Sequence, residues 1–159
     1  MSDERLLRSA ARGDAPSLET FIRHHAPDVY RFLVGMLGDE LEAGDAMQET
    51  FVRVARSVGR YQSDEDPVSW LFAIARRVST DVRPTPSAAP LPMRDGEDSG
   101  AWARRALRAL PAEHRGVLVA RDVMGWTDER IAAVLAIDPA DVPMRVTQAR
   151  EAMLVQETV

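Results

Sequence analysis

Apolar residues recur at intervals of three and four along most of this chain, a spacing that predicts amphipathic helices. Residues 2–12 form the first such segment, with Ser2 at the position of a helix cap. Asp14, closely followed by a proline, restarts the chain as the cap of a second segment. A further helix is predicted to begin at Pro27 and to end at Gly38. The pattern therefore predicts a helical amino-terminal region.

The segment from Asp45 to Tyr61 has the most informative pattern. Five apolar residues are expected to face inward along one side of a helix: Met47, Phe51, Val54, Ala55 and Val58. Polar and charged residues fall elsewhere on it: Asp45, Gln48, Glu49, Arg53, Arg56 and Arg60. Such a helix is usually a core helix with one solvated face, so periodicity alone assigns it no function.

The next helix is predicted to follow the acidic loop 62–66, with Asp66 and Pro67 at its start. Its apolar side is formed by Leu71, Ile74, Ala75 and Val78. Its other side carries Arg76, Thr80 and Arg83 at helical spacing. A solvated face is the commoner fate of such residues, and contact with a nucleic-acid strand is the alternative.

Residues 84–100 differ in composition and contain four prolines, so they are predicted to be a linker between domains 1–83 and 101–159. In the second domain, Thr127 is predicted to cap a short helix that a tight turn joins to the last helix. The last helix is expected to bury Val142, Val146, Ala149 and Met153. Two short helices joined in this way make a helix-turn-helix candidate, although many small helical domains share the pattern.

Composition narrows the classes of function. The chain has no cysteine, no apolar stretch long enough to span a bilayer and no secretory signal, so we expect a cytoplasmic protein without membrane insertion. His24 and His25 lack the spacing of metal ligands, and no nucleophile or phosphate-loop motif is present, so neither a metal, another cofactor nor an enzyme is predicted. The net charge is −5, and residues 1–83 hold 11 arginines against 14 acidic residues. If the chain binds nucleic acid, another protein would therefore have to supply much of the electrostatic attraction to the phosphates.

Three motifs in succession carry a resemblance to a known family: DAMQETFVRV, WLFAIARRVSTD and LPAEHRGVLVARDVMGWTDERIAAVL. Their order and their spacing along the chain resemble those of the extracytoplasmic-function (ECF) sigma factors of bacterial transcription. The resemblance implies an all-α protein in which a Pro-rich linker joins sigma domain two to the helix-turn-helix sigma domain four. It implies a non-enzymatic subunit that directs core RNA polymerase to promoters and helps to melt them. An anti-sigma protein is a further candidate partner, since such proteins often cover both domains in this family.

The resemblance also implies two sets of contact residues. Core RNA polymerase would meet Asp45, Gln48, Glu49, Val52 and Arg56. Promoter DNA would meet Tyr61, Trp70, Arg76, Arg77, Thr80 and Arg83 in domain two, and Arg145, Gln148 and Arg150 in domain four. Trp70 is equally a candidate for the core. Carboxylates suit a polymerase surface rimmed by basic residues, and aromatic or Arg side chains can stack on exposed bases.

Two departures from the family pattern favour an alternative function. The promoter-melting loop carries Asp64, Glu65 and Asp66, whose charges would repel phosphates. In the last helix, Pro143 and Gln148 stand where relatives usually have Lys and Arg, while Asp141 can still cap the helix. The alternative is a degenerate sigma-like module that binds polymerase or an anti-sigma protein without sequence-specific DNA reading.

Overall fold

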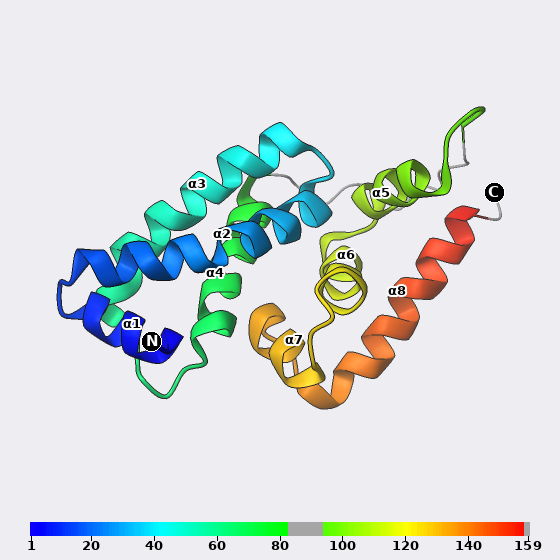
Figure 1. Cartoon of the computed structure of the whole chain (residues 1–159). Helices are drawn as coiled ribbons and strands as arrows, with labels where there is room; N and C mark the ends of the chain where they lie inside the picture. The colour runs from blue at the N-terminus through cyan, green and yellow to red at the C-terminus, as the bar shows by residue number, and fades with distance from the viewer. Residues whose placement is uncertain (83–93, 158–159) are drawn as a thin grey trace.

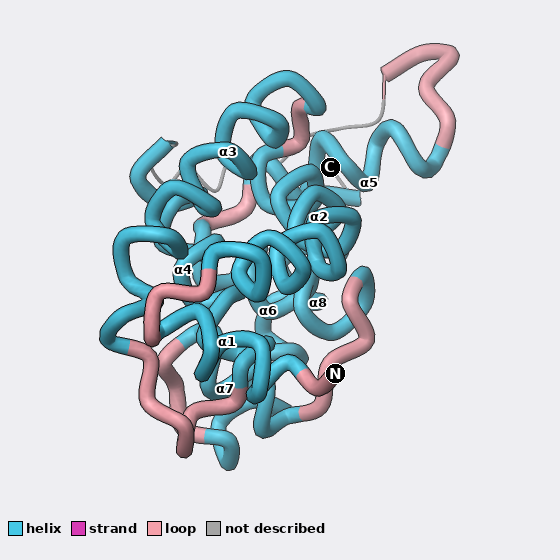
Figure 2. The backbone as a smooth tube through the Cα atoms, turned by 60° about the vertical axis from the view of Figure 1, so that its left-hand side comes forward, coloured by secondary structure: helices cyan, strands magenta, loops and turns pink. Residues whose placement is uncertain are grey.

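The computed structural model describes residues 1–82 and 94–157, and every regular element within them is a helix, as predicted. The amino-terminal half contains α1 (Asp3–Ala11), α2 (Ala15–Leu37), α3 (Glu40–Ser57), the 3₁₀ turn η1 (Val58–Arg60) and α4 (Pro67–Val82). The carboxy-terminal half contains α5 (Ser99–Ala109), α6 (Ala112–Leu118), the π-helical turn η2 (Val119–Val123), α7 (Asp128–Leu135), the 3₁₀ turn η3 (Pro139–Asp141) and α8 (Val142–Glu157). Figure 1 shows the halves side by side, and Figure 2 shows helices joined by short loops.

Several helix ends lie where the sequence predicts them. Ser2 accepts a hydrogen bond from the backbone N–H of Arg5, and Thr127 accepts one from Arg130 at 3.3 Å. Gly38 follows α2 in the left-handed conformation, with φ of 71°, which glycine adopts without steric cost. These local signals were sufficient because a cap depends on residues that are close in sequence.

One predicted cap is at the predicted residue but lacks a side-chain bond, and another lies at a different residue. Asp14 precedes α2 but makes no side-chain bond to the helix backbone; it accepts the hydroxyl of Ser17 instead. Asp141 belongs to η3, and Asp138 caps that turn by accepting from the N–H of Ala140 at 2.9 Å. The chain therefore enters α8 through one 3₁₀ turn, which supplies a cap further upstream than the predicted one.

The predicted helix boundary at Pro27 is also wrong, because α2 runs through this residue without interruption. A proline inside a helix removes one backbone hydrogen bond and crowds the preceding turn. In α2, Phe21 before the proline and Val29 after it are both fully buried. Packing on both sides of Pro27 therefore holds the helix together where local propensity would end it.

The buried side of α3 differs from the prediction at one residue. Val54 and Val58 are buried, and Met47 and Phe51 pack against the core, but Ala55 is exposed. The helix begins at Glu40, earlier than predicted, and adds Ala43, Ala46 and Thr50 to the buried side. Ala55 follows the buried Val54 by one residue, about 100° around the helix, so it points away from the core.

The predicted linker lies mostly outside the described residues, with one correction at its end. Asp98 accepts a hydrogen bond from the N–H of Ala101 at 2.7 Å and so caps α5. The last two residues of the predicted linker, Ser99 and Gly100, are therefore helical. The predicted domain ranges themselves stay a prediction.

A single buried core joins the two halves, with α4 against α7, and with α2 against α6 and η2. At their junction the ring of Phe72 meets those of Phe32 and Trp126 at centroid distances of 5.5 and 4.8 Å, both edge to face. Edge-to-face contacts of buried rings stabilise such a junction beyond the area they bury. No helix within residues 1–82 and 94–157 combines the length and the apolar character that crossing a bilayer requires.

Candidate functional site

The surface of α3 opposite its buried side is an exposed edge, which we call the outer stripe. It consists of Leu41, Asp45, Gln48, Val52 and Arg56, spaced three or four residues apart. Leu41 is 82% exposed and Val52 is 41% exposed, and polar side chains separate them. Four of the five predicted polymerase-binding residues therefore lie together on this stripe. Figure 1 shows α3 along the edge of the amino-terminal half. Leu41 was missed because the predicted helix began too late.

Glu49, the fifth predicted polymerase-binding residue, takes part in an internal network beside the stripe. Its carboxylate accepts from Nε of Arg53 at 3.1 Å, and Nη1 of Arg53 also donates to Asp81 on α4 at 2.9 Å. The hydrogen bonds to Asp81 and then to Glu49 raise the pKa of Arg53. Glu49 therefore helps to tie α3 to α4 and is less available to a partner than Asp45.

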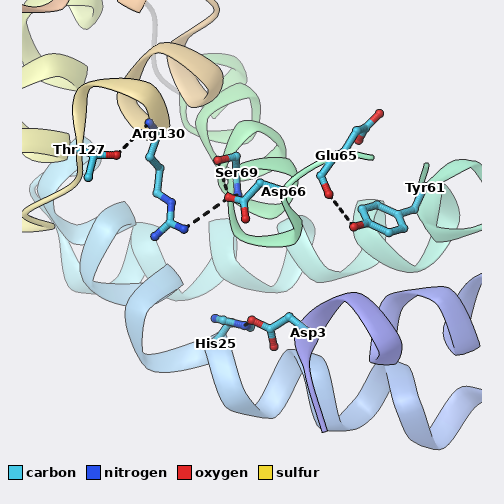
Figure 3. Close-up of polar contacts among 8 residues, drawn as sticks. All are labelled: Asp3, His25, Tyr61, Glu65, Asp66, Ser69, Thr127 and Arg130. Carbon is cyan, nitrogen blue, oxygen red and sulfur yellow. Dashed lines mark hydrogen bonds and ion pairs between the residues drawn. The ribbon is translucent and has the colours of Figure 1, made fainter. Parts of the chain in front are cut away.

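Tyr61 lies in the core rather than on a nucleic-acid surface. Its hydroxyl donates to the carbonyl oxygen of Glu65 at 2.7 Å (Figure 3), and its ring meets the half-buried ring of Trp70 edge to face at 5.4 Å. Burial, reinforced by the charge of Glu4, raises the pKa of Tyr61. In this conformation the two rings hold the loop before α4 and do not present a stacking platform to a base.

Asp66, one of the three acids in that loop, links the two halves. One of its oxygens accepts from the N–H and hydroxyl of Ser69 at 3.0 and 2.7 Å, which caps α4. Nη2 of Arg130 on α7 approaches the same oxygen at 3.4 Å (Figure 3). Partial burial acts to raise the pKa of Asp66, but the bonds from Ser69 and the charge of Arg130 outweigh it and lower the pKa. Asp64 and Glu65 remain exposed.

The predicted DNA contacts on α4 have different environments. Arg76 is half-buried, and its Nε donates to the carbonyl oxygen of Val134 on α7 at 3.2 Å. Burial, followed by the nearby charge of Arg77, lowers the pKa of Arg76. Arg77 and Thr80 are exposed, and the Thr80 hydroxyl donates to the carbonyl oxygen of Arg76 at 3.0 Å. Arg83 lies outside the described residues.

A cleft of about 290 Å³ lies between the halves beside Arg76. Its polar lining is formed by Arg76, Thr80, Glu113 and Arg145, with apolar side chains between them. The structure thus brings together Arg76 and Arg145, which the sequence assigned to separate promoter contacts.

On α8, the predicted contacts Arg145 and Arg150 each have an acidic neighbour. Nη1 of Arg145 lies 3.9 Å from Oε2 of Glu113, and Nη2 of Arg150 donates to Asp122 at 2.8 Å. Gln148 is exposed. The three residues therefore remain near the surface, with both arginines already close to a carboxylate.

The residues that join the halves were not predicted from the sequence. Arg115 follows Glu113 and His114 in the sequence, yet it is only 2% exposed, and Trp126 is 7% exposed. Polar neighbours such as these are typical of an exposed segment, so the local sequence did not indicate a buried cation. His25 pairs with Asp3 at 2.9 Å (Figure 3), and within residues 1–82 and 94–157 no cluster of His, Asp and Glu could hold a metal ion.

Comparison with known proteins gives consistent matches. Residues 21–83 match the family described as Sigma-70 region 2. The chain is 31% identical to the ECF RNA polymerase sigma factor SigC of Mycobacterium tuberculosis, an alignment covering 94% of this chain and 88% of that protein. It is 32% identical to the RNA polymerase sigma factor CarQ of Myxococcus xanthus, with coverage of 87% and 88%.

Two solved structures share the fold. CnrH in complex with the cytosolic domain of CnrY matches with a TM-score of 0.78 and 23% identity, over 96% of this chain and 94% of that one. The sigma factor RpoE of Bartonella quintana, in complex with the anti-sigma factor NepR, matches with a TM-score of 0.63 and 20% identity, over 85% and 94%.

Proposed function

The chain belongs to the ECF sigma factors of bacterial RNA polymerase, and from this premise we propose that the outer stripe of α3 is its docking surface for core polymerase. The protein is a sigma factor: it directs core RNA polymerase to promoters and assists their opening. It acts as a regulatory subunit, and the cytoplasm, where polymerase works, is the proposed location.

The uncovered outer stripe carries this proposal. Leu41 and Val52 offer apolar contact area, and Asp45 and Gln48 lie between them with a charge and an amide. A docking surface commonly combines apolar side chains with polar groups that fix the register. A carboxylate at Asp45 also favours encounter with a basic-rimmed surface, particularly at low ionic strength.

In the proposed function, the two halves must change their arrangement before the promoter can be opened. Arg77 and Thr80 can already meet a DNA strand, but α7 covers Arg76 through the carbonyl of Val134. A ligand shifts a conformational equilibrium only by binding one state more tightly. Polymerase and promoter together would therefore favour a form in which α7 has left α4.

A binding measurement with purified core polymerase tests the docking proposal. Asp45→Arg combined with Gln48→Ala should weaken the affinity on the order of tenfold or more, because it replaces a complementary charge at the interface with a like one. Glu19→Arg is the matched control, since it reverses an exposed charge on a different helix, α2. Arg145→Ala should also leave core binding unchanged. Equal affinity of the double variant and Glu19→Arg would exclude the outer stripe.

The degenerate-module alternative makes a different prediction for the same holoenzyme. A decoy would bind core polymerase yet leave it no more promoter-selective than before. The observation in its favour is the pairing of Arg145 and Arg150 with acidic residues of their own half. Transcripts mapped after reconstitution on a random promoter library separate the two functions, because only a sigma factor would yield defined start sites.

An anti-sigma protein is proposed as a further partner. Its support is that CnrH and RpoE, which share this fold, were solved in complexes with CnrY and the anti-sigma factor NepR. A candidate anti-sigma protein should reduce core binding when it is added to the purified chain, and unchanged core binding would reject that candidate.

A further inference from the structure

The outward side of α8 carries four exposed residues, which we call the reading face: Met144, Thr147, Gln148 and Glu151. They lie opposite the buried residues Val142, Val146 and Ala149. Successive residues of a helix are about 100° apart, and at this spacing the centre of the reading face points away from the core. As the second helix of a helix-turn-helix, α8 would place these side chains toward base edges in a major groove.

Arginines flank the reading face on both sides. Arg145 and Arg150 each lie roughly 100° from its centre, one toward each edge of the helix. Their ion pairs with Glu113 and Asp122 are at the surface, and exchanging a surface pair for a phosphate changes the free energy little. The distribution therefore fits a duplex, with the two cations toward the phosphate strands and Met144, Thr147, Gln148 and the carboxylate of Glu151 toward the bases.

The exposed groups of the reading face differ in what they can recognise. The Thr147 hydroxyl donates to the carbonyl oxygen of Pro143 at 3.1 Å, so the methyl group is left for a partner. Met144 is 54% exposed and adds a second apolar contact. Across the described parts of the chain no hydrogen bond occupies the Gln148 amide, so both its donor and its acceptor face solvent.

We propose that the reading face recognises an A·T base pair, with Gln148 as the specificity-determining residue. A glutamine amide can donate to N7 and accept from N6 of adenine, whereas the N7 and O6 acceptors of guanine require two donors. The methyl groups of Thr147 and Met144 suit the C5 methyl of thymine. This inference rests on the proposed function, because the helix must first be delivered to a promoter.

Glu151 completes the face and supports the same orientation. A carboxylate would be repelled by phosphates but can accept a hydrogen bond from the amino group of a base. Its position one turn beyond Gln148 therefore favours adenine or cytosine at the neighbouring position, because only these bases present an amino group in the major groove. The face contains no cation that could form the usual bidentate contact with guanine.

The test uses holoenzyme reconstituted from the full chain and core polymerase, with a promoter library randomised in its upstream duplex. Sequencing of the bound fraction should show enrichment of adenine at one position. Gln148→Ala should reduce that discrimination about 5- to 150-fold, the usual range for one bidentate contact. Gln148→Arg should move the preference at that position from adenine to guanine.

Two threonine variants provide a matched comparison. Thr147→Ser removes the methyl group and retains the bond to Pro143, and it should weaken selection of the paired thymine. Thr20→Ser on α2 alters a threonine that makes the equivalent bond to Pro16, and it should leave base selection unchanged. Circular dichroism of each variant checks that the helices are retained.

A parallel assay separates failure of this inference from failure of the proposed function. Core binding and initiation are measured on a template whose start region is already unpaired. Loss of both would overturn the proposed function. Initiation with no base preference, or a preference unchanged by Gln148→Ala and Gln148→Arg, would overturn the inference alone.

Discussion

Nη1 of Arg115 on α6 donates to the carbonyl oxygen of Met36 on α2 at 2.8 Å and so joins the two halves of the chain. The same guanidinium donates to the carbonyl oxygens of Leu107 and Leu110 at 3.0 and 2.7 Å. The last carbonyls of a helix lack partners within it and carry partial negative charge. The buried guanidinium at the end of α2 therefore supplies a hydrogen-bond donor to a carbonyl oxygen that α2 cannot pair by itself.

Replacement of Arg115 by lysine should destabilise the protein although the charge is kept. A single ammonium group cannot reproduce the planar fork that reaches three separate carbonyls. Leaving buried acceptors unpaired should lower the free energy of unfolding by on the order of 3 kcal/mol. Urea denaturation measures this, with the exposed Arg23→Ala as a control expected to change little. Wild-type stability of Arg115→Lys would contradict the role of the fork.

Gly35 permits the close approach of α2 and η2. A Cβ atom at this residue would lie 3.0 Å from Cγ1 of Val119, which is fully buried and cannot turn away freely. Gly35→Ala should gain about 1 kcal/mol of helix propensity but lose about 1–3 kcal/mol to overpacking. We expect a net decrease in the free energy of unfolding and a larger radius of gyration in X-ray scattering.

Gly44 offers the matched control for that substitution. It also lies within a helix, α3, but nothing is within 4 Å of the position its Cβ would take. Gly44→Ala should therefore raise stability by up to about 1 kcal/mol. If both alanine variants were stabilised equally, the contact between Gly35 and Val119 would not limit the packing of the halves.

The lowered pKa of Asp66 predicts a pH dependence of stability. A carboxylate with a folded-state pKa below its ordinary value of 3.8 stabilises the fold at higher pH. That contribution is complete above the ordinary value and is lost as the pH falls through the lowered one. Because the side chain is about half-exposed, the effect should stay below about 1 kcal/mol. Asp66→Asn retains a cap acceptor without titrating.

Urea denaturation of wild type and Asp66→Asn at several pH values measures this effect. The stability advantage of the wild type should be present near neutrality and shrink below about pH 4. A constant difference across that range would show that the charge of Asp66 does not contribute to the fold.

The contact between α4 and α7 predicts that closure blocks promoter opening but not polymerase binding. The chain contains no cysteine, so Asp66→Cys with Arg130→Cys introduces two thiols, one on each half. After treatment with a short bifunctional thiol crosslinker, the outer stripe stays accessible while α7 cannot leave Arg76. We expect core binding to persist and promoter opening, followed by permanganate reactivity of unpaired thymines, to fall at least tenfold, about 1.4 kcal/mol.

The same double variant without crosslinker is the control, since it loses the Asp66 cap to the same extent. It should open promoters at a rate close to that of the wild type. Efficient opening by the crosslinked form would show that the halves need not separate for initiation.

The sequence by itself determined the features that depend on near neighbours. Ser2 and Thr127 act as the predicted caps, and four predicted polymerase-binding residues, including Asp45 and Gln48, share one edge of α3. Helical periodicity fixes which residues share a side, and a cap is made within one turn. The succession of motifs was enough to indicate the family.

Only the tertiary structure decided which of those residues are covered. Arg76 finds its carbonyl partner 58 positions away and Arg115 finds one 79 positions away, so neither could be read from local spacing. Packing on both sides carries α2 through Pro27, against the local preference of proline. Each of these contacts forms because the two halves bury apolar surface against each other. That burial depends on the whole fold and not on any one helix.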